Sequence, residues 1–163
     1  MEKEKKWSFA FSVDLHPLVE GRKLVIGGIE IPFSKGALGH SDGDALLHAL
    51  TDALLSAGGF PDIGSIFPDK DPQYKDKESF FFLKKALELV KSKGFRVYQV
   101  DLTVILDEPK VAPYYERIKE TVAKWLEISP EQIGLKARTT EGVLFSKEKP
   151  AIMAYALVVL EKG

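Results

Sequence analysis

The stretch from His40 to Gly59 constrains the fold of this 163-residue chain more than any other segment. It opens with polar residues that suit a loop and a helix N-cap. From Asp44 it continues as a largely apolar helix pattern that ends at two glycines. This helix places His48 and Asp52 one turn apart on the same face. The stretch therefore predicts a capped helix that carries a candidate metal ligand.

The remainder of the chain alternates strand and helix patterns, with no repeat or linker that would divide it. Strands are predicted at 7–15, 95–106, 133–139 and 151–160, and a tight hairpin at 24–31 turns on Gly27-Gly28. Helices are predicted at 44–57, 79–93 and 112–127. We therefore expect one domain over residues 1–163, with 1–6 as an N-terminal tail. Its fold should be an α+β sandwich in which helices cover one face of a single mixed sheet.

Composition excludes several classes of function. With 45% hydrophobic residues and a formal net charge of −1, the chain can bury a core and shows no basic excess. Nucleic acid and anionic membranes are therefore not expected as partners. No apolar run approaches the roughly 18 residues of a membrane span, and the N-terminus lacks a signal-peptide pattern. The chain has no cysteine, so a metal site must use His, Asp or Glu. We expect a cytoplasmic protein.

Asp14, His16 and His48 form the candidate metal site. A strand places residues i and i+2 on one face, so Asp14 and His16 point the same way, and the helix adds His48. Three such ligands and an open position are typical of catalytic zinc. The alternative is that both are ordinary, partly buried histidines, and composition leaves the two interpretations open.

Nearby polar residues have two interpretations as well. His40 is either a fourth ligand or a hydrogen-bonding partner of a substrate. Asp42, Asp44 and Asp52 are either acceptors for the imidazole N–H groups or helix caps and surface charge, and capping suits Asp44 best.

Two further segments are candidate binding loops. Residues 62–72 combine acidic side chains, a lysine and two prolines. Such a rigid polar loop can hold a sugar or a diol, or it can be a plain surface connection. Residues 136–142 end a predicted strand with hydroxyls, Arg138 and Glu141, which can hold a phosphate and a hard cation. Their alternative is a simple turn at Gly142.

A series of short motifs in this order resembles one known family. They are Asp14-Leu15-His16, Ile26-Gly27-Gly28, His40-Ser41-Asp42-Gly43-Asp44, His48-Ala49-Leu50-Thr51-Asp52, Asp62-Ile63-Gly64, Phe67-Pro68-Asp69, Pro109-Lys110 and Thr139-Thr140-Glu141. Together they resemble the 2-C-methyl-D-erythritol 2,4-cyclodiphosphate synthases of the non-mevalonate isoprenoid pathway. The resemblance extends from about residue 8 to residue 160.

The resemblance implies a cyclisation. In that family the 2-phosphate of 4-diphosphocytidyl-2-C-methyl-D-erythritol 2-phosphate attacks the β-phosphorus, which releases CMP and closes the ring. By analogy, Zn²⁺ binds to Asp14, His16 and His48, and Mg²⁺ or Mn²⁺ is held by Glu141. His40 and Thr139 match the residues that stabilise the transition state. Phosphoryl transfer depends mainly on positioning and charge neutralisation, so the lack of a cysteine nucleophile is no objection.

The same resemblance implies the substrate contacts and the assembly. Ser41 matches a phosphate contact, and the loop that binds the methylerythritol part matches Asp62, Ile63, Gly64, Phe67, Pro68, Asp69, Lys70 and Asp71. The cytidine and diphosphate contacts match Leu106, Pro109, Lys110, Val111, Ala112, Arg138, Thr139, Thr140, Glu141 and Phe145. Family members are homotrimers whose sheets line the axis and whose active sites lie between neighbouring subunits.

This sequence departs from the family pattern at two places. Arg138 stands where the family often has a third threonine. Residues 147–151 replace a Gly-Arg-Gly-Glu-Gly-like segment whose arginine, in some members, faces an axial cavity that holds an isoprenoid diphosphate. Glu148 falls near that arginine, so the same ligand is not expected here. Two rival functions stay open: a zinc hydrolase acting on a phosphate ester, and a trimeric binding protein for CMP-like nucleotides with a structural metal.

Overall fold

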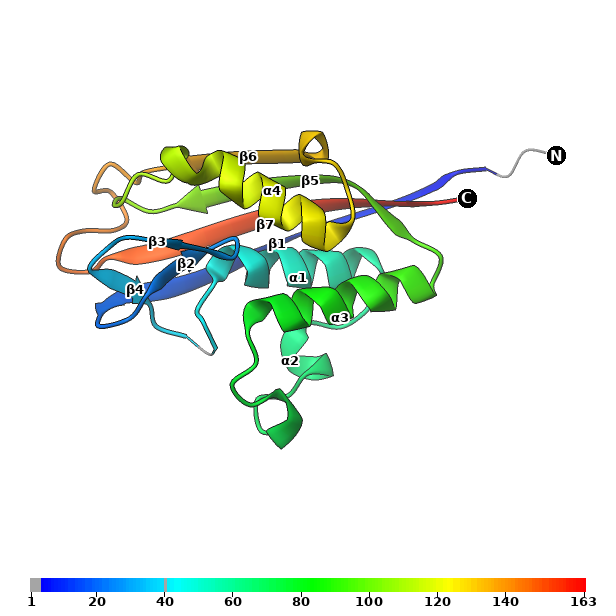
Figure 1. Ribbon diagram of the computed structural model, residues 1–163, viewed down its shortest axis with the longest axis horizontal. Helices are drawn as coiled ribbons and strands as arrows, with labels where there is room; N and C mark the ends of the chain where they lie inside the picture. Colours follow the sequence, from blue (N-terminus) through cyan, green and yellow to red (C-terminus); the bar gives the residue numbers. More distant parts are fainter. Residues whose placement is uncertain (1–3, 40) are drawn as a thin grey trace.

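The structure is a computed structural model that describes residues 4–39 and 41–163. A five-stranded sheet forms one layer and three helices of twelve to fourteen residues form the other (Figure 1). The strands are β1 (Lys6–Glu20), β4 (Lys35–Ala37), β5 (Arg96–Ile105), β6 (Ile133–Arg138) and β7 (Ala151–Lys162), and β2 (Leu24–Ile26) pairs with β3 (Ile29–Ile31). The long helices are α1 (Ala45–Ala57), α3 (Ser79–Ser92) and α4 (Tyr115–Leu126). Short turns of helix are α2 (Ile63–Ile66), η1 (Pro72–Tyr74), η2 (Ala112–Tyr114) and η3 (Pro130–Gln132).

The sheet is mixed, as predicted. Its strand order is β4-β1-β7-β5-β6, in which β5 and β6 run parallel and the other neighbours are antiparallel. Because β5 and β6 are parallel, the loops that follow them, 106–112 and 139–150, leave the sheet at the same end, and Figure 1 shows both there beside β4. None of the helices in the described residues is long and apolar enough to cross a membrane.

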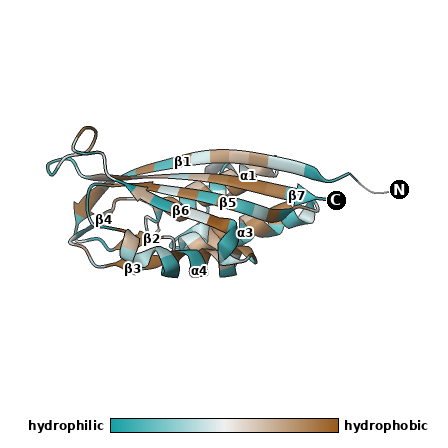
Figure 2. Cartoon of the chain, turned by 90° about the horizontal axis from the view of Figure 1, so that it is seen from above, coloured by the Kyte–Doolittle hydropathy of each residue, from teal (hydrophilic) through white to brown (hydrophobic). Residues whose placement is uncertain are grey.

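The two faces of the sheet differ sharply in what covers them. Alternate residues of β7, from Ile152 to Leu160, are buried under the helices, which lie on one side of the sheet (Figure 2). On the other side β1 exposes large apolar side chains to solvent, namely Trp7, Phe9, Phe11, Val13 and Leu15. Phe9 alone is 71% exposed. An apolar face of this extent marks an interaction surface.

Helix α1 packs closely on β1 because both elements present small side chains. Ala45, Ala49, Ala53 and Ala57 repeat every four residues along α1 and are all buried. The hydroxyl of Ser8 on β1 donates to the carbonyl oxygen of Ala57 at 2.5 Å. A strand side chain thus reaches the helix backbone directly, which fixes how far α1 lies from β1.

Most predicted elements are confirmed, and the differences have local causes. Strand β1 continues past the predicted end at residue 15 to Glu20, although Pro17 lacks an N–H. Pro17 pairs with Ala151 and uses its carbonyl oxygen to accept the N–H of Leu38. Lys6, assigned to a tail, already belongs to β1, whereas residues 1–3 lie outside the described part. Strand β4 and the short helices α2 and η1 were missed because three or four residues carry no periodicity.

Asp44 connects three parts of the fold and confirms its predicted role as a cap. Its side chain is fully buried and accepts the N–H groups of Leu47 at 3.0 Å, Gly27 at 3.0 Å and Gly28 at 2.7 Å. The first bond caps α1, and the other two hold the β2–β3 turn, where both glycines have positive φ. Burial raises the pKa of Asp44 to about 6 against the opposing effect of these N–H groups. At neutral pH it therefore stays an acceptor for all three.

We predict that Asp44→Asn lowers the free energy of unfolding by about 2–3 kcal/mol, because its NH₂ group must face a buried N–H and leave it unpaired. Urea unfolding at neutral pH measures the change. Glu30→Gln, an exposed carboxylate on the same hairpin, is the control and should change stability by less than about 0.5 kcal/mol. Equal effects of the two substitutions would contradict the assigned role of Asp44.

Candidate metal centre

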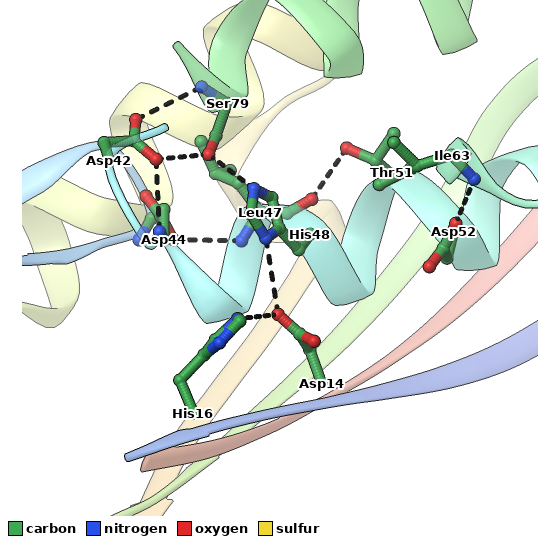
Figure 3. A network of polar contacts seen from close by, with 11 residues as sticks. Asp14, His16, Asp42, Asp44, Leu47, His48, Thr51, Asp52, Ile63 and Ser79 are labelled. Carbon is green, nitrogen blue, oxygen red and sulfur yellow. Dashed lines mark hydrogen bonds and ion pairs between the residues drawn. The ribbon is translucent and has the colours of Figure 1, made fainter. Parts of the chain in front are cut away.

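Asp14, His16 and His48 converge at one point between β1 and α1. Asp14 and His16 lie two residues apart on the inner face of β1, and His48 comes from the first turn of α1 (Figure 3). The Oδ2 atom of Asp14 lies 2.7 Å from Nε2 of His16 and 3.4 Å from Nδ1 of His48. Within the described residues, these three form the one group whose ligand atoms lie within 4.8 Å of one another and can hold a metal ion. The predicted cluster is confirmed.

The charges in the cluster are coupled. Burial by itself would raise the pKa of Asp14, but hydrogen bonds and charge interactions with His16 and His48 outweigh it and hold that pKa far below its usual range. Burial would lower the pKa of His48, and the contact with Asp14 reverses this and raises it. Asp14 is therefore a carboxylate under all ordinary conditions, which suits a group that must present a charged oxygen to a cation.

The donor set fits a divalent metal ion. Two imidazole nitrogens and one carboxylate oxygen are ligands that zinc takes in catalytic sites, which keep a further position open. The three side chains are partly buried, so they are held by their surroundings yet reachable from the adjacent cavity. A Cβ added at Gly39 would lie 2.9 Å from Cε1 of His16, so the backbone there packs directly against the imidazole and restricts its orientation.

The other side of His48 faces a serine that the sequence did not single out. Ser79, the first residue of α3, places its hydroxyl 2.9 Å from Nε2 of His48 and donates it to Asp42. Asp42 is thus near His48 but acts through Ser79, whereas Asp52 accepts the N–H of Ile63 at 2.8 Å. No spacing rule links a serine to a histidine 31 positions before it, so sequence alone gave no signal.

A cavity of about 390 Å³ opens beside the cluster. Of the predicted substrate loop, Ile63, Gly64, Phe67 and Asp69 line it together with Ser41. Asp62 and Asp71 are instead N-caps of α2 and η1. Pro68 and Lys70 belong to the same loop but are not among the lining residues. Asp52, a predicted neighbour of His48, also lines the cavity, and so do five residues that no sequence pattern indicated, namely Tyr74, Lys75, Asp76, Lys77 and Phe82.

The predicted cytidine and diphosphate residues gather elsewhere. Thr139, Glu141 and Phe145 line a separate cavity of about 540 Å³ together with Asp107 and Glu108. The neighbouring predicted residues lie at this same end of the sheet: Arg138 is the last residue of β6, Ala112 begins η2, and the loops contain Leu106, Pro109, Lys110, Val111 and Thr140. Leu106 and Val111 are buried, and the Glu108–Pro109 peptide bond is cis.

Asp107 fixes the loop that carries Thr139 and Glu141. Its carboxylate accepts the backbone N–H of Thr140 at 2.6 Å and the hydroxyl of Thr140 at 2.9 Å. That hydroxyl oxygen in turn accepts the N–H of Phe145 at 3.2 Å. The clamp turns Thr140 inward, and Glu141, at a φ of 55°, is presented to the cavity.

The two cavities share no lining residue. On one chain, therefore, the predicted site residues fall into a metal half and a Glu141 half rather than into a single pocket. His40, a predicted catalytic residue, lies outside the described residues, so the structure does not test it.

Comparison with known proteins identifies the family to which this chain belongs. The model of the YgbB family matches residues 8–161. The chain belongs to the YgbB family. Among its relatives, the 2-C-methyl-D-erythritol 2,4-cyclodiphosphate synthase of Geobacillus sp. (strain WCH70) is 50% identical over 91% of this chain and 94% of its own length. The synthase of Bacillus subtilis (strain 168) is 48% identical over 92% of this chain and 95% of its own.

A solved structure agrees with the sequence relatives. A 2C-methyl-D-erythritol-2,4-cyclodiphosphate synthase in its CDP-bound form superimposes with a TM-score of 0.87 at 41% identity. The match covers 93% of this chain and 99% of that one. Membership of the YgbB family therefore places the chain among the enzymes that form the cyclodiphosphate in isoprenoid biosynthesis.

Loss of a residue that only supports a metal ligand lowers metal affinity by about 10–100-fold. We predict that Asp14→Asn and His48→Ala each lower the affinity for zinc by more than this. Each change removes one of three donors, and the metal content after dialysis against a chelator measures it. Glu141→Gln is the control, because Glu141 lies in the other cavity and its loss should leave the zinc content unchanged. Full zinc retention in Asp14→Asn would contradict the assignment of the site.

Proposed function

We propose that the chain closes the cyclodiphosphate ring at the Asp14, His16 and His48 cluster. The substrate is 4-diphosphocytidyl-2-C-methyl-D-erythritol 2-phosphate, and the products are 2-C-methyl-D-erythritol 2,4-cyclodiphosphate and CMP. The observation that carries this proposal is the three-donor cluster at the wall of a cavity. Such a cluster can neutralise a phosphate next to a polar loop that can hold the sugar.

In the proposed reaction one phosphorus–oxygen bond replaces another. An oxygen of the 2-phosphate attacks the β-phosphorus and forms a new bond to it. The bond between that phosphorus and the bridging oxygen breaks, and CMP leaves with the oxygen and its electron pair. No water is consumed, which makes the enzyme a phosphorus–oxygen lyase. Divalent ions supply positive charge that lowers the repulsion between the attacking phosphate and its anionic target.

The residues of this chain have separate proposed tasks. Asp14, His16 and His48 hold Zn²⁺, and Glu141 supplies the one carboxylate that Mg²⁺ or Mn²⁺ needs when phosphates provide its other ligands. Thr139 and His40 stabilise charge that develops on the transferring phosphorus. The further contacts follow the two loops. Ser41 and the segment 62–71 hold the phosphate and sugar, and Leu106–Ala112 receives the cytosine.

We further propose a cytoplasmic homotrimer with its active sites between subunits. Two observations support this arrangement. The metal half and the Glu141 half of the site lie in cavities that share no residue on one chain, so a second subunit is needed to bring them together. The outer face of β1 carries the exposed apolar row from Trp7 to Leu15, which suits burial along a common axis.

Phosphorus NMR tests the reaction directly. With zinc and Mg²⁺ loaded, we expect two coupled diphosphate resonances and the CMP signal to replace those of the substrate. His48→Ala should abolish them. Release of free phosphate would favour the zinc hydrolase, and unchanged substrate in the metal-loaded protein would favour the nucleotide-binding protein.

Mixed assemblies test the shared site. His48→Ala and Glu141→Gln should each be inactive alone, whereas trimers formed by co-expressing both should regain about one quarter of the wild-type activity, the share of interfaces that pair two intact halves. Subunits that carry both substitutions, co-expressed with Glu141→Gln, are the control and should stay inactive. An inactive mixture of the two single variants would mean that each site belongs to one chain.

A further inference from the structure

A partly buried chain of hydrogen bonds connects Asp42, Ser79 and His48. Ser79 is fully buried, and its hydroxyl lies between the other two side chains (Figure 3). The hydroxyl donates to Oδ1 of Asp42, and the backbone N–H of Ser79 donates to Oδ2 of the same carboxylate at 3.2 Å. On its other side the hydroxyl oxygen lies 2.9 Å from Nε2 of His48.

Counting protons along this chain assigns the hydrogen on His48. An ionised carboxylate only accepts, so the single hydroxyl hydrogen of Ser79 points to Asp42. The oxygen of Ser79 then offers lone pairs to His48, and Nε2 must carry the hydrogen that fills the contact. Nδ1 faces Asp14, 3.4 Å from Oδ2, and in the metal-free protein it donates a hydrogen to that carboxylate. A metal ion bound beside Asp14 would replace only this hydrogen, and Nε2 would keep its own and donate it to Ser79.

We propose that Ser79, held by Asp42, is a positioning residue that fixes the tautomer and ring orientation of His48 for the metal ion. The proposal rests on the proposed metal-binding function of Asp14, His16 and His48. Histidine ligands need such a partner on the second nitrogen, because otherwise part of the neutral ring population presents an N–H to the metal. Ser79, whose own side chain is fully buried, fills this position.

The backbone hydrogen bond of Ser79 allows a test that distinguishes this role from a purely structural one. Asp42 also accepts the N–H groups of Ser79 and Asp44, and so it caps α3 from outside the helix and supports the start of α1. Ser79→Ala keeps the backbone bond to Asp42 and deletes only the hydroxyl. Any change in metal affinity in this variant then reports on His48 and not on the start of α3.

Two substitutions perturb the hydrogen bond between Ser79 and Nε2 of His48 in different ways. Ser79→Ala removes the acceptor, so both tautomers of His48 become accessible. Asp42→Asn reverses the direction of the chain. If its amide oxygen keeps the N–H of Ser79, its NH₂ donates to the hydroxyl oxygen, and the hydroxyl hydrogen turns toward Nε2. That arrangement selects the tautomer whose Nδ1 carries hydrogen, which cannot bind a metal ion.

The matched control is Thr51→Ala. Thr51 lies on α1 one turn beyond the first, is also fully buried, and donates its hydroxyl to the carbonyl oxygen of Leu47 at 2.7 Å. Its removal should cost stability without touching the imidazole. Thermal unfolding of each metal-free variant records the stability change separately from metal binding.

The measurements are zinc affinity by chelator competition, the visible spectrum of the Co²⁺ form, and long-range ¹H–¹⁵N NMR of the zinc-bound protein. We expect Ser79→Ala to lose about 10–100-fold in zinc affinity, Asp42→Asn to lose more, and Thr51→Ala to keep wild-type affinity. The Co²⁺ spectrum should change in the first two only. In the zinc-bound wild type the Nε2–H of His48 should be protected from exchange with water, and this protection should be lost in Ser79→Ala and Asp42→Asn.

Wild-type zinc affinity in both Ser79→Ala and Asp42→Asn, with Nε2–H retained, would overturn the proposal. If Ser79→Ala does not fold, Asp42→Asn alone decides by the same two readouts. Equal zinc affinity of the wild type and His48→Ala would instead refute the proposed metal site.

Discussion

The close approach of α1 to β1 is the contact on which the site depends. Metal ligands on a strand and on a helix meet only if the two backbones are near, and the alanines of α1 and the Ser8–Ala57 hydrogen bond hold them there. Asp44 then fixes where α1 begins, because its carboxylate joins the first turn to the β2–β3 hairpin. The position of His48 opposite Asp14 is therefore a consequence of packing and capping together.

Sequence reasoning reached those features that depend on local spacing. The strand period of two brought Asp14 and His16 onto one face, and the capped helix pattern supplied His48. It failed where an interaction joins distant segments. Ser79 contacts His48 only because α3 packs beside α1, and no periodicity in either segment predicts that packing. The clamp between Asp107 and Thr140 is similar, since it depends on the parallel pairing of β5 and β6.

The likeness to known synthases and the geometry of the chain support different conclusions about its function. Family membership gives the reaction, whereas the geometry of the single chain supports the proposed trimer. The residues that line the metal cavity fall between Asp14 and Phe82, and Thr139 and Glu141 line the other cavity. In the proposed trimer these two features are linked, because the apolar sheet face that would join the subunits would also bring complementary cavities together.

The carboxylates of Asp42 and Asp44 near His48 have one more consequence, which concerns the electric field in the cavity. A helix carries partial positive charge at its N-terminus, and α1 and α3 both begin beside this site. Asp44 accepts three N–H groups, and Asp42 accepts two N–H groups and a hydroxyl. Their negative charge is therefore partly offset by the helix macrodipoles. Acidic residues placed in this way can orient the site and repel an entering anion less than free carboxylates would.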